Sequence, residues 1–185
     1  MDRLTPETSV LLVVDVQERL ASAMPTETMA RLTSNALVLL ESARLLGVPV
    51  LASEQYPRGL GATIAPIAAK LAELGVARVD KLCFDACGEP RLGRALARSD
   101  RRAVVVIGME AHVCVFQTAR ELVRRGYSTY VVADAVASRR EENRVLGLAL
   151  AERAGAIVTP TETVVFDWLG RAGTDEFKVI SKLLR

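Results

Sequence analysis

Short runs of apolar, mostly β-branched residues alternate along the chain with longer segments in which apolar residues recur every three or four positions. Continuous apolar runs are typical of strands that are covered on both faces, as in a parallel sheet. The runs are Val10–Val14, Val48–Ala52, Arg78–Leu82, Ala103–Ile107, Ser128–Val132 and Ala156–Val158. We therefore expect six strands.

The segments between these runs predict helices. One places Leu32, Ala36, Leu39, Leu40, Ala43 and Leu46 on a single face. The others are Ala65–Leu74, Glu89–Arg98, His112–Arg125 and Arg139–Ala154. Glycines follow four of the helical segments, where a left-handed C-cap is expected: Gly47, Gly75, Gly126 and Gly155.

Two capping patterns mark expected helix starts. Ser138 and Glu141 have the spacing of a capping box. The segment Thr159–Glu162 repeats this pattern, with Pro160 in the first helical position. From residue 161 onward the alternation of strands and helices ends, and we expect one or two helices there. The apolar segment Val164–Leu169 indicates a buried contact with a second subunit.

The repeated strand–helix order predicts an α/β fold of three αβα layers, with a six-stranded, mainly parallel, Rossmann-like sheet. The length of 185 residues suits a single domain over 1–185. Half of the residues are hydrophobic and a quarter are charged, which excludes a disordered chain. The net charge of +2 gives no case for nucleic acid or an anionic membrane as a partner.

Few features indicate export, membrane insertion or metal binding. Three cysteines are too few for a disulfide scaffold and favour a reducing compartment. The segment Met1–Thr8 carries charges unlike an export signal, and Val10–Val14 is too short to span a bilayer, so we expect a cytoplasmic protein. His112 is the single histidine, which excludes a metal site built on two or three histidines.

In open α/β sheets, ligands bind at the carboxyl ends of strands, and three reactive residue types occur there. Asp15 ends the first apolar run, Lys81 lies at the third, and Cys114 follows the fourth within a predicted first helical turn. Free amides and the helix dipole at that turn favour a thiolate and could hold an oxyanion. Each residue also has a structural interpretation: a capping or bridging aspartate, a surface lysine, and a small core cysteine.

Together these residues resemble the isochorismatase-like cysteine hydrolase superfamily, which includes nicotinamidases and N-carbamoylsarcosine amidases. The similarity extends over nearly the whole chain and is greatest to the isochorismatase domain-containing branch. The segments that carry it are Leu12–Gln17, Ser53–Gly61, Asp80–Lys81, Gly108–Val115, Val132–Val136 and Ser138–Arg140.

The resemblance implies a catalytic triad of Asp15, Lys81 and Cys114 and a homo-oligomer. It also implies a cis peptide bond between Met109 and Glu110, and an oxyanion hole formed by the backbone amides of Glu110 and Cys114. The activity that follows is hydrolysis of a small amide or ureido compound through a thioester on Cys114. Asp15 acts as acid and base, and Lys81 supports the thiolate.

The sequence departs from the metal-dependent nicotinamidases, because Ser53–Arg58 contains no histidine. We therefore expect no metal and no cofactor, with Glu54 as the remaining residue there that could contact a cation. Further candidates for substrate contact are Gln17, Tyr56, Phe84 and His112. The partner is then a small-molecule substrate.

Two other functions remain open. One is a redox protein in which Cys83 or Cys87 resolves an oxidised Cys114. The other is a non-catalytic scaffold that uses the fold for assembly or binding. Cys83 and Cys87 are four residues apart, unlike a redox pair, and small buried thiols are the alternative interpretation.

Overall fold

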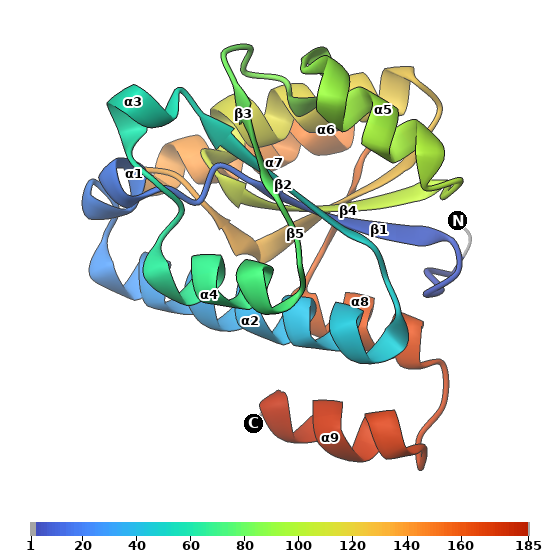
Figure 1. Ribbon diagram of the computed structural model, residues 1–185. Helices are drawn as coiled ribbons and strands as arrows, with labels where there is room; N and C mark the ends of the chain where they lie inside the picture. Colours follow the sequence, from blue (N-terminus) through green and yellow to red (C-terminus); the bar gives the residue numbers. More distant parts are fainter. Residues whose placement is uncertain (1–2, 185) are drawn as a thin grey trace.

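The computed structural model of the protein describes residues 3–184 and contains a six-stranded sheet with the order β3-β2-β1-β4-β5-β6 (Figure 1). The strands are β1 (Ser9–Val14), β2 (Val50–Gln55), β3 (Arg78–Lys81), β4 (Ala103–Met109), β5 (Ser128–Ala137) and β6 (Ile157–Thr159). Every neighbouring pair is parallel. The predicted fold class is confirmed, and each strand lies at one of the predicted runs.

The carboxyl ends of the central strands meet at one edge of the sheet. Val14, the last residue of β1, lies opposite Ser53 of β2 and Gly108 of β4. Gln55 of β2 lies opposite Lys81 of β3. This register brings the residues that follow β1, β3 and β4 to the same edge, as the site prediction requires.

Helices cover both faces of the sheet and form the two outer layers (Figure 1). One layer contains α2 (Thr26–Leu46), α4 (Ala65–Glu73) and α8 (Thr161–Leu169), and α9 (Asp175–Leu183) packs on this layer against α2, on the side away from the sheet. The other contains α5 (Pro90–Arg98), α6 (Phe116–Arg124) and α7 (Glu141–Arg153). Short segments near the strand ends complete the chain: α1 (Glu18–Ser22), α3 (Pro57–Leu60), the 3₁₀ turn η1 (Ala86–Gly88) and the π-helical turn η2 (Ala111–Val115).

Two hydrophobic cores lie between the sheet and these layers, because successive side chains of a strand point to opposite faces. In β1, Leu11 and Val13 pack toward α2, whereas Val10, Leu12 and Val14 pack toward α5 and α6. All six β1 residues are buried, which accounts for the continuous apolar run in the sequence.

The C-terminal segment corrects one prediction. Val164, Val165 and Trp168 of α8 are buried in the core of their own chain, and the Trp168 indole donates a hydrogen bond to Ser9 Oγ at 3.0 Å. The apolar residues in Val164–Leu169 therefore pack mainly inside the chain and not against a second subunit. Phe166 is the exposed exception.

The helix ends confirm the glycine predictions and correct the capping ones. Gly47, Gly75, Gly126 and Gly155 all have positive φ. Ser138, however, does not cap α7, because that helix begins at Glu141 and its N-cap, Arg140, makes no side-chain capping bond. Pro160 precedes α8 as its N-cap. Asp134 Oδ1 instead accepts hydrogen bonds from the amide and hydroxyl of Thr161, the first residue of α8.

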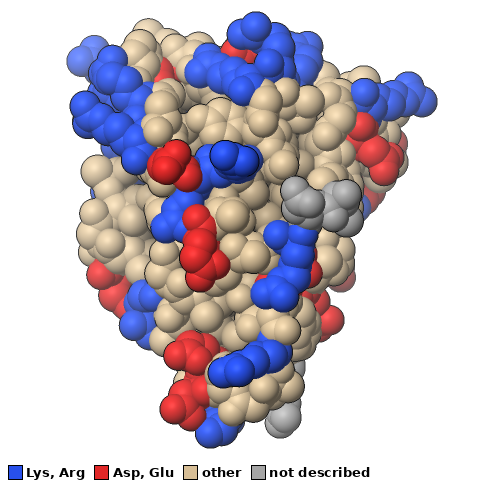
Figure 2. All heavy atoms as spheres, turned by 90° about the vertical axis from the view of Figure 1, so that its right-hand side faces the viewer, with Lys and Arg blue, Asp and Glu red and all other residues tan. Residues whose placement is uncertain are grey.

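Charged side chains are spread over the surface. In Figure 2, basic and acidic side chains are both distributed over the face shown, with uncharged surface between them. Within residues 3–184, no helix is both long and apolar enough to cross a lipid bilayer.

Candidate active site

A buried ion pair joins Asp15 and Lys81 at the carboxyl edge of the sheet. The distance from Lys81 Nζ to Asp15 Oδ2 is 2.7 Å, and both side chains are 0% exposed. Asp15 adopts a left-handed backbone conformation with φ of 53°, which directs the chain away from β1. Removing two charges from water is costly unless they are paired and hydrogen-bonded. The surface interpretation of Lys81 is therefore wrong.

The Lys81 ammonium group is surrounded by further oxygen acceptors. It donates to Gln55 Oε1 at 2.6 Å and to the backbone carbonyls of Phe84 and Cys83 at 3.0 and 3.2 Å. An ammonium group has three protons to donate, so these acceptors and Asp15 fully occupy it. The Lys81 side chain is thus fixed in position.

Two residues of β2 complete this arrangement, and the sequence analysis did not single them out. Ser53 Oγ donates to Asp15 Oδ1 at 2.7 Å, while Gln55 accepts from Lys81. Positions 53 and 55 share one face of a strand because side chains alternate along it. The end of β2 therefore orients both members of the ion pair.

Gln17 has a structural role in place of the predicted substrate contact. Its side-chain amide donates to the carbonyls of Gln55 and Gly61 at 3.1 and 2.7 Å and accepts from the Gln55 amide at 2.7 Å. The side chain is fully buried, so its polar groups serve the backbone. Gln17 thereby fixes Gln55, which in turn holds Lys81.

Cys114 lies in the π-helical turn η2 directly after β4. The peptide bond between Met109 and Glu110 is cis, at the position that the resemblance implies. The Glu110 carbonyl accepts from the amides of Val113 and Val115, which ties β4 to the turn. The Glu110 carboxylate is buried and accepts from the Arg139 amide and side chain at 3.0 and 3.1 Å. The Glu110 side chain therefore connects η2 to the end of β5.

The surroundings of the Cys114 thiol oppose its ionisation. Burial and the neighbouring Asp15 carboxylate raise the pKa of the thiol to about 12, although the charge of Lys81 acts in the opposite direction. Burial and Asp15 thus oppose the resting thiolate that the helix start and Lys81 are expected to favour. The carboxylate next to this thiol is that of Asp15.

This pKa predicts how Cys114 reacts with iodoacetamide in the folded protein. Labelling should accelerate by about tenfold per pH unit between pH 7 and 10, because the thiolate is the nucleophile. Asp15→Asn should accelerate labelling at pH 8, since it removes the charge that opposes ionisation. Lys81→Met should slow it. Peptide mass spectrometry measures the labelling rate of each cysteine separately.

Cys87 is the internal control for this measurement. Burial, and next the charge of Asp85, raise its pKa to about 12 as well, and neither Asp15 nor Lys81 contributes. Its labelling should therefore be equal in all three proteins. If the Cys114 labelling rate rose with pH and then levelled off before pH 9 was reached, the raised pKa of the thiol would be contradicted.

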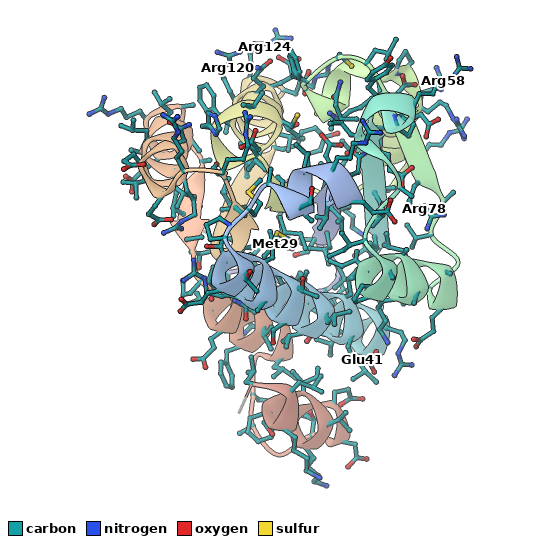
Figure 3. All side chains as sticks on the ribbon, turned by 90° about the vertical axis from the view of Figure 1, so that its left-hand side faces the viewer. Met29, Glu41, Arg58, Arg78, Arg120 and Arg124 are labelled. Carbon is teal, nitrogen blue, oxygen red and sulfur yellow. The ribbon has the colours of Figure 1, made fainter. Side chains whose placement is uncertain are left out.

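A pocket of about 450 Å³ lies next to the ion pair. Its lining includes Tyr56, Arg58, Lys81, Leu82, Cys83 and Glu89. Of the predicted substrate contacts, Tyr56 is in this lining, whereas Phe84 is exposed and contributes its carbonyl to Lys81. Arg58 extends from α3 at the rim of the molecule (Figure 3). Asp15 and Cys114 are not part of the lining, and the Lys81 side chain that reaches Asp15 is itself buried.

The His112 ring contacts Ser138, as expected for a residue that is not the base for Cys114. Its Nδ1 atom lies 3.0 Å from Ser138 Oγ, so the ring bridges η2 and the end of β5. This contact also explains why Ser138 does not cap α7.

The remaining cysteines form no disulfide, and Glu54 is held by contacts within the protein. All three cysteines are free, with Cys87 buried in the same core as Cys114 and Cys83 in the pocket lining. Glu54 Oε1 accepts from the amide and hydroxyl of Thr63 at 2.7 and 2.6 Å and lies 3.5 Å from Arg78 Nε. Among residues 3–184 there is no group of three or more histidine, cysteine, aspartate or glutamate side chains that could hold a metal ion.

Comparison with known proteins agrees with this fold. Residues 9–163 match the Isochorismatase domain family. Isochorismatase domain-containing protein 2A of Mus musculus is 34% identical over 186 residues, which cover 100% of this chain and 86% of the mouse protein. The secreted isochorismatase effector Isc1 of Phytophthora sojae is 37% identical over 191 residues, covering 100% of this chain and 88% of Isc1.

A solved structure extends the comparison to three dimensions. The MAR1 ribonuclease from Caenorhabditis elegans superposes with a TM-score of 0.91 at 36% identity, over 99% of this chain and 92% of that chain. The chain therefore belongs to the isochorismatase family of hydrolases.

Proposed function

We propose that the protein is a metal-independent cysteine hydrolase that cleaves a C–N bond in a small amide or ureido compound. Cys114 is the nucleophile, Asp15 is the acid and base, and Lys81 fixes Asp15 and stabilises the thiolate that forms. The backbone amides of Glu110 and Cys114 form the oxyanion hole.

The observation that carries this proposal is the buried ion pair next to a buried thiol. Burying a lysine and an aspartate with 0% exposed side chains carries a large desolvation cost, which their pairing has to offset. Here a thiol whose pKa depends on both charges lies beside the pair. Strongly perturbed ionisable groups that interact in this way are typical of catalytic sites.

The reaction proceeds in two halves. Asp15 takes the thiol proton, Cys114 Sγ attacks the carbonyl carbon, and the two amides stabilise the oxyanion. Collapse of this intermediate breaks the C–N bond, and Asp15 returns its proton to the leaving nitrogen. Asp15 then deprotonates a water molecule, which cleaves the thioester and releases the acid and the free thiol.

Three further statements belong to this proposal. The whole chain acts as one domain, its location is cytoplasmic, and it forms a homo-oligomer. The three free cysteines support a reducing compartment. Because one relative is named a secreted effector, the location needs its own measurement.

The proposal is tested by incubating the purified protein with small primary amides, ureido acids and a short RNA. The RNA is included because a structural relative is named a ribonuclease. We expect ammonia release from at least one amide or ureido compound, and a mass increase on the Cys114 peptide after rapid acid quench that equals the acyl group. Cys114→Ala should abolish both signals.

Two controls separate this mechanism from the alternatives. Cys83→Ala should leave turnover within about twofold of the wild type, which a redox pair with Cys114 would not allow. RNA cleavage that persists in Cys114→Ala, without amide hydrolysis by the wild type, would overturn the proposal.

A further inference from the structure

Helix α7 carries an exposed apolar stripe on the side away from the sheet. Val145, Leu146 and Leu150 are 52%, 59% and 42% exposed, although large apolar side chains are mostly buried elsewhere in the chain. At about 100° per residue, one stripe of the helix surface contains these three residues together with Glu142, Ala149 and Arg153. We call these six residues the α7 stripe.

The opposite side of α7 is fixed against the segment that carries the nucleophile. A Cβ atom on Gly147 would lie 2.7 Å from the Cα of His112 and from the Ala111 carbonyl carbon. The backbones of α7 and η2 are therefore in direct contact. The helix cannot rotate to bury its stripe without losing this contact, so the stripe stays exposed on the surface of the chain. α7 also lies at one end of its layer (Figure 3).

The stripe is complementary to itself. Its apolar residues lie in the middle, with an acid at the N-terminal end and a base at the C-terminal end. Glu142 and Arg153 lie at equal distances from the point between Gly147 and Leu148, as do Val145 and Leu150. Both charged residues are exposed, and neither forms an ion pair within residues 3–184, whereas Glu141 and Arg144 pair with each other.

These features define the symmetry of the partner. In a two-fold dimer the same surface of both subunits meets itself, so residue i contacts residue j and j contacts i. Two antiparallel copies of α7 would place Glu142 of each opposite Arg153 of the other, with leucine and valine side chains between them. Within one helix, residues 142 and 153 are about 16 Å apart along the axis and cannot pair.

We propose that a second copy of this chain docks on the α7 stripe, antiparallel and about a two-fold axis between Gly147 and Leu148. The proposal specifies one contact of the proposed homo-oligomer and does not depend on the hydrolase chemistry. A single helix pair is at the low end of interface size, below about 1,200 Å² in total. One unfavourable charge pair on each side is therefore enough to separate the subunits.

Charge reversal tests this geometry by sedimentation velocity of the full chain at 1–100 µM. Glu142→Arg and Arg153→Glu should each weaken self-association by at least about tenfold, because each variant places like charges opposite one another twice. The double variant should restore wild-type association. An equimolar mixture of the two single variants should form a heterodimer, since both of its cross-pairs are then of opposite sign.

A matched control reverses an equal charge elsewhere. Glu176→Arg, on the exposed surface of α9 beyond the other helix layer, should associate as the wild type does. Circular dichroism confirms that each variant is folded. A wild-type chain that stays monomeric at 100 µM, single variants that keep the wild-type mass, or a mixture that does not associate would each overturn the proposal. The hydrolase assay and the Cys114 adduct report separately on the proposed function.

Discussion

Asp15→Asn is expected to reduce kcat/KM for the hydrolysed amide by about 10³-fold. The loss of a positioned general base or acid costs about 10²–10⁴-fold, and Asp15 is proposed to serve in both halves of the reaction. Asparagine preserves the size of the side chain and can still accept a hydrogen bond from Ser53. The substitution therefore removes proton transfer and charge with little change in packing.

Asp15→Asn is expected to change the hydrolysis rate and the labelling rate in opposite directions, which makes the prediction specific. Hydrolysis should fall while iodoacetamide labelling of Cys114 at pH 8 should accelerate, because Asp15 both accepts the thiol proton and opposes its ionisation. A merely structural role for Asp15 would lower both rates. Steady-state ammonia release and labelling rates are measured on the same preparation, after circular dichroism confirms the fold.

Ser53→Ala provides a graded comparison. It removes the charge-assisted hydrogen bond to Asp15 Oδ1 and leaves the carboxylate and its pairing with Lys81 in place. A hydrogen bond to a charged group contributes about 1.5–3 kcal/mol, so a loss of about 10- to 100-fold in kcat/KM is expected. If Asp15→Asn were no more damaging than Ser53→Ala, Asp15 would not be the base.

The sheet and its order of elements could be predicted because they depend on local pattern. In β1, burial of every residue makes the apolar run continuous, and the glycines after the helices are needed for their positive φ. The positions of Asp15 and Cys114 followed from the same logic, since they come directly after predicted strands. Local pattern gave a wrong prediction where a residue distant in sequence binds the side chain. The Ser138 hydroxyl contacts His112 and does not cap α7.

The residues that orient the site could not be predicted, because their roles depend on strand register. Ser53 reaches Asp15 only because it lies opposite Val14, and Gln55 reaches Lys81 because those two residues are paired in the sheet. Nothing in the sequence states this pairing. Burial likewise raises the pKa of Cys114, and the argument from the helix dipole did not include burial.

Lys81→Met is expected to lower the free energy of unfolding by about 3–5 kcal/mol at pH 7. The substitution keeps most of the side-chain volume but leaves the Asp15 carboxylate fully buried with no positive partner, and breaking a buried pair from one side carries a cost of this size. Urea denaturation followed by circular dichroism measures it. Lys178→Met, at an exposed pair with Asp175, is the control, and its effect should stay below about 1 kcal/mol.

The double variant Asp15→Asn/Lys81→Met shows whether the loss comes from the unpaired charge. It has no buried ion at the site, so it should be clearly more stable than Lys81→Met alone, although it is inactive. Replacing both members of a buried pair is often neutral or stabilising, whereas removing one is not. If the double variant were as unstable as the single one, lost packing around Lys81 would explain the effect, and the ion pair would have no special energetic role. A more stable but inactive double variant would instead show that the pair is retained for its chemistry at the expense of stability, as the proposed function of Asp15 and Lys81 requires.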